Sequence, residues 1–263
     1  MLDWRLQTHI FCRWDKRWRS LGYVLCGILL WGGASEAQAM GKDDAVQVAY
    51  LNVGQARNNR PRALQQLILY LTKRTSVKVS LQTLRLPPSD PRLFSMPFLL
   101  LTGTQAFPPL ESASILRLRT YLRAGGLLWI DVSERGRQSP FDRSARRFVQ
   151  RLFPKKSLEK ISRNHTIYRS FYLIRRFAGR VLRRPYLEGI TLDDRSVVLY
   201  SLNDFAGAWS KDAFGQWTFP VVPGDVVQRE NAFRIGINVL MYALCVNYKQ
   251  DLVHAPTIMR RRR

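Results

Sequence analysis

The sequence is poor in cysteine and histidine, which narrows the kinds of site that the chain can carry. It has three cysteines and three histidines among 263 residues. No pair of histidines or cysteines has the spacing of a zinc site, and no run of spaced carboxylates is present. The glycine-rich phosphate loop and the Gly-x-Ser-x-Gly elbow of hydrolases are also missing. The sequence therefore predicts no metal site and no bound cofactor.

Acidic residues are also scarce, and this shortage bears on possible partners. Lys and Arg number 42 against 19 Asp and Glu, which gives a net charge of +23. A charge of this size attracts polyanions such as nucleic acid, anionic lipid or cell-envelope polymers. Aromatic residues among the arginines favour contact with an anionic surface, including peripheral contact with a membrane. The arginines concerned are Arg143, Arg146, Arg147, Arg175, Arg176, Arg180, Arg183 and Arg184, and those that end the chain are Arg260, Arg261, Arg262 and Arg263.

No apolar run is long enough for a comfortable transmembrane span. The run Leu21–Leu30 follows a basic region and precedes Ala37-Gln38-Ala39. This order of basic, apolar and small residues is typical of a secretory signal and predicts cleavage near Ala39. An uncleaved segment that anchors the chain in a membrane is the alternative.

Export fixes the predicted organisation and excludes some partners. We interpret residues 1–39 as a signal peptide, 40–250 as one α/β domain and 251–263 as a basic tail. The mature protein is expected to be periplasmic or secreted, where nucleic acid is not a partner. Cleavage leaves Cys245 as the one remaining cysteine, so no disulfide can form within the chain. We expect Cys245 to pack in the core.

The stretch from Phe98 to Asp131 predicts the centre of the fold. Two apolar runs, Phe98–Gly103 and Leu127–Asp131, flank an amphipathic segment at Leu110–Arg123. Because the strands of a parallel sheet are buried on both faces, this pattern favours a parallel βαβ unit. Further strands are expected at Val46–Val53, Val77–Thr83 (an edge strand), Leu187–Ile190 and Ser196–Ser201, and helices are expected from Pro61, at Phe141–Leu152 and at Glu230–Cys245.

The carboxyl ends of these strands are where a ligand is expected, because open parallel sheets bind ligands in the crevice beyond them. Asp131 is the most suggestive residue there. A carboxylate directly after Leu-Leu-Trp-Ile must be hydrogen-bonded, paired or functional. A cap for the following turn is an equal alternative. The candidate ligand-binding residues at the strand ends are Thr102, Gly103, Asp131, Ser133, Asn203 and Asp204.

His165 is a candidate general acid or base. The alternative is that it orders a loop through a hydrogen bond to the backbone. A hydrolase acting on an envelope carbohydrate or peptidoglycan fragment would need Asp131, His165 and Asp204 around one pocket. Trp209 and Trp217 flank a glycine-containing stretch that we interpret as a surface flap, where they would be able to stack on sugars.

Short motifs run through nearly the whole predicted domain, from about Val46 to Tyr248. They are Met96–Gly103, Leu116–Gly126 with Asp131, Phe141–Ser144, Leu152–Pro154, His165–Tyr172, Leu187–Ile190, Tyr200–Asp204 and Ala232–Leu244. In this order the motifs resemble a bacterial family known as domain of unknown function 4159. That family is similar to the class I glutamine amidotransferase fold, so the resemblance implies a flavodoxin-like three-layer α/β sandwich with a mainly parallel sheet.

The resemblance also argues against glutamine hydrolysis. In active amidotransferases a nucleophilic cysteine follows the Gly-Gly strand, whereas this chain has Asp131 or Val132 there. Many family members carry two adjacent aspartates at that place, so Val132 weakens the case for a paired-carboxylate site. The sequence therefore favours a non-catalytic module that binds an envelope protein or an anionic envelope ligand. The hydrolase is the alternative.

Overall fold

The computed structural model describes residues 45–54, 60–133 and 139–260, with side chains described as far as Cys245. The predicted signal peptide and its cleavage site lie outside the described residues. Arg261, Arg262 and Arg263 also lie outside them, as does the side chain of Arg260. The predictions for these segments stay predictions.

The described residues form one seven-stranded sheet in the order β2-β1-β3-β4-β7-β6-β5. Counted by themselves, the five parallel strands have the order 2-1-3-4-5, which is that of flavodoxin-like folds. The predicted mainly parallel α/β sheet is confirmed. The parallel strands are β1 (Ala49–Leu51), β2 (Leu84–Leu86), β3 (Phe98–Gly103), β4 (Leu127–Val132) and β7 (Arg195–Ser201), and the antiparallel ones are β6 (Glu188–Leu192) and β5 (Glu159–Lys160).

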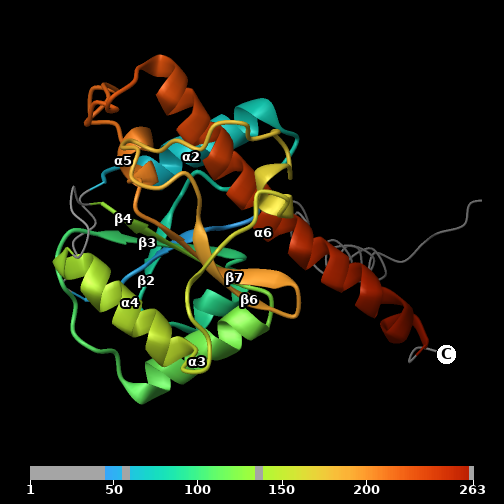
Figure 1. Cartoon of the computed structure of the whole chain (residues 1–263). Coiled ribbons are helices and arrows are strands. Elements are labelled where there is room, and N and C mark those ends of the chain that lie inside the picture. Colours follow the sequence, from blue (N-terminus) through green and yellow to red (C-terminus); the bar gives the residue numbers. More distant parts are fainter. Residues whose placement is uncertain (1–44, 55–59, 134–138, 261–263) are drawn as a thin grey trace, which may run out of the picture. The chain divides into compact units, whose positions relative to one another are not determined.

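Helices cover both faces of the sheet and make three layers (Figure 1). Each face has its own apolar core, one packed against α2, α5 and α6 and the other against α3 and α4. The helices are α2 (Ala63–Arg74), α3 (Ser112–Arg123), α4 (Pro140–Leu152), α5 (Phe205–Trp209) and α6 (Val226–Arg260), and short 3₁₀ helices lie at η1 (Pro91–Ser95) and η2 (Thr166–Tyr168).

The central βαβ unit consists of β3, α3 and β4, as the sequence predicts. All six residues of each strand are buried, which is why both strands read as nearly unbroken apolar runs. In the strand register Thr102 lies opposite Asp131, and Asp131 lies opposite Ser201. Polar side chains at the carboxyl ends of three neighbouring strands therefore lie close together.

The edge strand predicted at Val77–Thr83 is wrong. Only Val79 of this segment pairs, in an isolated bridge with Val46, and the edge strand β2 follows it at Leu84–Leu86. The Ser80 hydroxyl accepts a hydrogen bond from the Gln82 amide, so the chain turns between the bridge and the strand. The alternation of apolar and polar residues is typical of a half-exposed segment. An extended connection has this property as well as a strand does.

The last helix is longer than the pattern of apolar residues indicates. It begins at Val226 and continues to Arg260, through residues where we expected no periodicity. Among the α6 residues whose side chains are described, those as far as Cys245, the last buried one is Ala243. Cys245 is exposed, so the expectation that it packs in the core is wrong.

Trp209 belongs to the core and not to a surface flap. It is fully buried in α5, where its ring packs edge-on against Trp129 with centroids 5.4 Å apart. Trp217 is 38% exposed, and the Lys211 and Arg229 side chains lie over its ring. Within the part of the chain that the structure describes, no helix is both long enough and apolar enough to cross a membrane.

Candidate functional site

Asp131 lies at the carboxyl end of β4 with no solvent exposure. Its Oδ1 accepts a hydrogen bond from the Ser201 hydroxyl of β7. Its Oδ2 accepts one from the Ala206 amide at 2.8 Å. The carboxyl group therefore ties β4 to β7 and to the first turn of α5.

Burial raises the pKa of Asp131 to about 7, and the nearby charge of Asp204 adds to this rise. The hydrogen bonds from Ser201 and from the amides of Phe205 and Ala206 act in the opposite direction, because they favour the ionised form. Both the protonated and the ionised carboxyl are therefore populated near neutral pH.

Asp204 is also fully buried and adopts a left-handed backbone conformation with φ of 49°. Its Oδ1 caps α5 by accepting a hydrogen bond from the Gly207 amide at 3.0 Å. A Cβ atom at Gly207 would lie 2.5 Å from Asp204 Oδ2, so this position requires glycine. The cap fixes where the Asp204 carboxylate points.

Two arginines hold the Asp204 carboxylate. Arg60 donates from Nε to Oδ1 at 2.8 Å and from Nη2 to Oδ2 at 2.7 Å, and Arg180 donates from Nε to Oδ2. All three side chains are at least 96% buried. We call this group the Arg60–Asp204–Arg180 cluster. The Arg60 guanidinium also lies over the Phe219 ring, 4.1 Å from its centroid.

The cluster extends to the ends of β3 and β4. Arg60 Nη2 donates a hydrogen bond to the Ser133 carbonyl. The Ser133 hydroxyl in turn bonds the Thr102 hydroxyl, and the Ser133 amide donates to the Gly103 carbonyl at 3.3 Å. The structure thus brings together Thr102, Gly103, Ser133 and Asp204, with Asp131 close enough for Asp204 to affect its pKa.

Asn203 is buried beside this group but its amide is used by the protein itself. Its Oδ1 accepts from the Arg183 and Arg184 amides at 3.1 and 2.9 Å, and its Nδ2 donates to the Arg184 carbonyl at 2.6 Å. A Cβ atom at Gly179 would lie 2.3 Å from the Asn203 carbonyl oxygen, so the backbones touch. Asn203 fastens the segment 178–184 over the end of β7.

His165 does not join these residues. Its ring lies 3.1 Å from the Ser196 hydroxyl, near the start of β7, whereas Asp131 bonds Ser201 at the other end. Five residues of strand separate the two, a span of about 16 Å. The Ile167 amide donates to His165 Nδ1 at 3.1 Å, which is the backbone contact that the loop-ordering interpretation requires.

The same hydrogen bonds decide what His165 can do for Ser196. Because Nδ1 accepts a hydrogen bond, the neutral ring carries its proton on Nε2 and donates it to the Ser196 hydroxyl. Burial and the nearby charge of Arg169 lower the pKa of His165, which favours the neutral ring. Ser196 therefore faces a donor and has no base to activate it as a nucleophile.

The sequence profile of a family described as "Domain of unknown function (DUF4159)" matches residues 46–244. The chain belongs to the DUF4159 family. No curated protein matches the chain. The matched range spans the whole sheet and the candidate site residues, which confirms the resemblance found in the motifs.

The sequence did not place Arg60 or Arg180 at this site of the DUF4159 domain. The expectation that Arg180 belongs to an anionic-contact surface is wrong, because its side chain is buried against Asp204. Arg60 directly precedes the proline at which the chain turns into α2, and Arg180 lies in a stretch without regular secondary structure. The available signal was the pair of aspartates at strand ends, because a buried carboxylate requires a cationic partner or a proton. That signal indicates that an arginine is present without saying which one.

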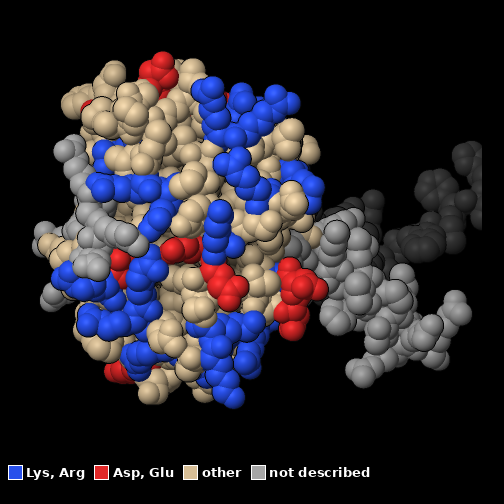
Figure 2. Space-filling view, viewed as in Figure 1, with Lys and Arg blue, Asp and Glu red and all other residues tan. Residues whose placement is uncertain are grey.

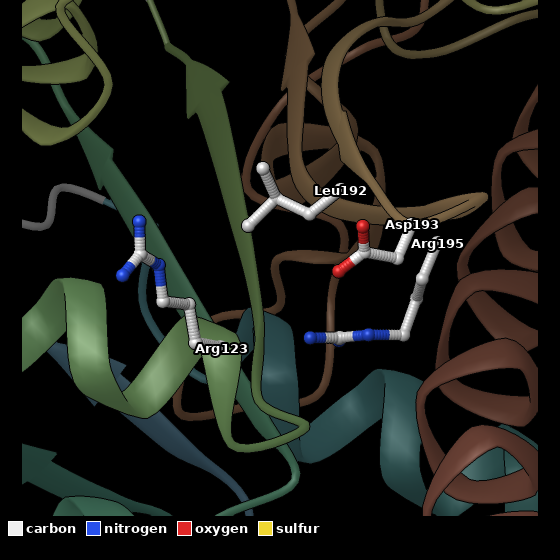
Figure 3. A pocket seen from close by; sticks show the side chains of 4 residues that line it. All are labelled: Arg123, Leu192, Asp193 and Arg195. Carbon is white, nitrogen blue, oxygen red and sulfur yellow. The ribbon is translucent and has the colours of Figure 1, made fainter.

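A cavity of about 570 Å³ lies at the opposite end of the strands, near the start of β7, and is lined by Arg123, Leu192, Asp193 and Arg195 (Figure 3). Arg195 donates from Nη1 to the carbonyls of Gly125 and Gly126 at 2.9 and 3.0 Å, and from Nη2 to that of Leu122. These carbonyls end α3, so Arg195 acts as a cap for that helix. The Arg195 guanidinium is therefore occupied by main-chain carbonyls and serves the helix end.

Proposed function

We propose that this DUF4159 domain is a non-catalytic binding module that takes a ligand or partner of the cell envelope in the crevice at the carboxyl ends of its strands. The observation that carries this proposal is the burial of Asp131 and Asp204. Each carboxylate is fully buried and bonded on both oxygens by the protein. Neither is placed to exchange a proton with a substrate in the crevice.

The strand order supports the position of the site. In a sheet of order 2-1-3-4-5 the crevice opens where the order reverses, between β1 and β3. Thr102 and Gly103 end β3 at this place, and Ser133 is bonded to both. Thr102, Gly103 and Ser133 are themselves buried, so in this proposal they form the floor of the expected crevice, with Asp131, Asn203 and Asp204 beneath them.

Charge supports an anionic ligand. The cluster contains two guanidinium groups and one carboxylate, and the pKa of Asp131 at about 7 leaves that neighbour partly neutral. The excess of 42 Lys and Arg over 19 Asp and Glu in the whole chain likewise favours an anionic ligand over a cationic one. The proposal includes export of the protein, its location in the cell envelope and its descent from an amidotransferase-like fold.

One observation favours a hydrolase as the second candidate. A carboxyl group with a pKa of about 7 is typical of catalytic acids and bases. The hydrolase would then use Asp131 with Asp204, while His165 stays with Ser196 at the other end of β7. Both carboxylates would first have to leave their present hydrogen bonds.

Thermal unfolding of the full chain with muropeptides, envelope oligosaccharides and anionic polymers, at low and high salt, tests the proposal. A ligand at a hundred times its dissociation constant adds about 2.7 kcal/mol of stability, which such a scan resolves. We expect a salt-resistant shift that Ser133→Ala reduces. Ser162→Ala is the matched control, because its hydroxyl only accepts a hydrogen bond from the exposed Asn164 amide.

Two results would contradict the proposal. Product formation from any of these compounds, followed by mass spectrometry and lost in Asp131→Asn, would make the protein a hydrolase. Shifts that disappear at high salt and are equal in Ser133→Ala and in the control would mean that the basic surface binds the polymers and the crevice does not.

A further inference from the structure

A second pocket, of about 500 Å³, lies beside the first turn of α6. In Figure 1 this end of α6 is the orange helix at the top of the view. Arg163, Arg175 and Arg176 line the pocket, together with Leu182 and Val227. It is separate from the crevice described above, although both border the segment 178–184.

The buried Gln228 side chain holds the walls of this pocket together. Its Nε2 donates to the carbonyls of Gly179, Arg180 and Val222 at 2.9, 3.0 and 3.1 Å. Its Oε1 accepts from the Gly224 amide at 2.9 Å. One side chain thus joins three backbone segments, so the pocket is preformed, as ligand sites usually are.

Acidic side chains among the described residues do not pair with the three arginines that line this pocket. Arg163, Arg175 and Arg176 form no ion pair with any residue that the structure describes, whereas Arg74, Arg146 and Arg180 are paired. The acidic residue at the pocket is Asp225, whose Oδ1 accepts from the Val227 amide and caps α6. Three arginines and one aspartate leave two net positive charges around one cavity.

Exposed aliphatic side chains surround the pocket. Leu182, Val226 and Val227 are 53%, 80% and 58% exposed, and Val222 is exposed as well. The segments that carry Leu182 and Val222 are joined by a bridge between Val181 and Val222. Apolar residues that gather on a surface mark a contact with another molecule or with a membrane.

The chemistry of this surface favours lipid over protein. Binding hot spots in protein interfaces are rich in Trp and Tyr and poor in Leu and Val. The large exposed apolar residues at this pocket are Leu and Val, and Phe177, an aromatic residue that lines it, is partly buried. Guanidinium groups match the geometry of phosphate oxygens. Lys and Arg form several patches on the face shown in Figure 2 and outnumber Asp and Glu there, which would attract a negative bilayer from a distance.

We propose that the pocket lined by Arg163, Arg175 and Arg176 binds the phosphate head group of an anionic phospholipid. Leu182, Val226 and Val227 then enter the interfacial layer of the bilayer beside it. This contact is a second activity of the domain and does not depend on what the strand-end crevice binds.

Hydrogen–deuterium exchange of the full chain tests this contact at its own residues. The probes are vesicles of phosphatidylcholine with or without phosphatidylglycerol. We expect slower exchange of the amides in residues 173–184 and 222–231 with the anionic vesicles only. Exchange reports each segment separately, so binding through the chain ends or through the crevice does not imitate the result.

Matched variants connect this protection to the pocket. Arg175→Gln combined with Arg176→Gln should weaken binding at the pocket by about thirtyfold, from about 1 kcal/mol per arginine near a negative surface. Arg123→Gln combined with Arg147→Gln removes the same charge from exposed positions outside the pocket and should keep the protection. Val226→Ser combined with Val227→Ser should remove the part of the binding that persists at high salt.

Three results would overturn the proposal. The first is vesicle binding without protection of the two segments. The second is an equal loss of protection in both arginine double variants, which would reduce the effect to net charge. The third is equal protection by inorganic phosphate, glycerol phosphate or polyglutamate without vesicles, which would replace the lipid by a soluble anion or an acidic protein.

Discussion

Arg195 lies at the amino ends of the parallel strands and Asp204 at their carboxyl ends, and different kinds of partner hold the two charges. Arg195 donates to three main-chain carbonyls, those of Leu122, Gly125 and Gly126. Asp204 is held by the charged side chains of Arg60 and Arg180. One end of the sheet therefore uses neutral dipoles, and the other uses opposite charges.

The difference shows which end is able to respond to a ligand or to pH. Main-chain carbonyls do not titrate, so the hydrogen bonds of Arg195 hold the end of α3 in the same way at any pH. At the carboxyl ends Asp131 shares its surroundings with Asp204, and its pKa rises to about 7. Ionisable groups that influence one another in this way are more typical of functional sites than of structural caps.

The largest change is expected when the charged end loses its carboxylate. Asp204→Asn leaves two buried guanidinium groups without their counter-charge, and we expect a loss of about 3–5 kcal/mol in the free energy of unfolding. Urea unfolding measures it. Asp90→Asn is the control, because Asp90 pairs with the exposed Arg92 and the loss of that pair should cost much less. Equal and small effects would mean that the buried cluster is not what stabilises this edge.

Asp131→Asn separates the two ends by their response to pH. The pKa of Asp131 is higher in the folded protein than its ordinary value of 3.8, so the folded state holds the proton more tightly. The contribution of Asp131 to stability is therefore complete below about pH 4 and is lost as the pH rises to about 7. The variant cannot ionise, and its amide resembles the protonated carboxyl.

Urea unfolding across this pH range measures the effect as the difference between the parent protein and Asp131→Asn. We expect the free energy of unfolding of the parent protein to fall relative to that of Asp131→Asn as the pH rises. Asp90→Asn should show the opposite sign, because the hydrogen bonds from Arg92 lower the pKa of Asp90. Parallel curves for the parent and Asp131→Asn would show that Asp131 is ionised throughout.

The smallest change is expected at the amino ends of the strands. Arg195→Lys keeps the positive charge but cannot reach three carbonyls at once. We expect a loss of about 1–2 kcal/mol, from the hydrogen bonds that are not replaced. The loss should vary little with pH, because the hydrogen-bond partners of Arg195 do not titrate and the lysine keeps the positive charge beside Asp193. A loss that varies with pH in the range where Asp131 titrates would break the distinction between the two ends.

Much of the fold and part of the site were predictable from the sequence. The unit of β3, α3 and β4 has both faces of its strands buried, which leaves apolar runs that few other structures produce. Once the strands were placed, topology predicted that Thr102, Asp131, Ser133 and Asp204 would meet. Residues that follow parallel strands share one edge wherever they lie in the chain.

The predictions that failed concern residues whose surroundings come from distant parts of the chain. Trp209 looks like a loop residue beside glycines, yet it is buried because α5 folds under the sheet against Trp129. Cys245 lies in an apolar helix but just past the part that packs on the sheet. The local sequence does not show whether Trp209 or Cys245 is buried, because that depends on which other elements pack against each residue.

The sequence by itself determined the α/β class, the order of the central elements and the presence of buried carboxylates at the strand ends. Only the tertiary structure decided that Arg60 and Arg180 hold Asp204. These arginines lie 144 and 24 residues from it in the chain, and 42 lysines and arginines compete for 19 acidic residues. Pairing in so basic a chain depends on which side chains are brought within hydrogen-bonding distance and shielded from water, because burial is what makes one pair stronger than the others.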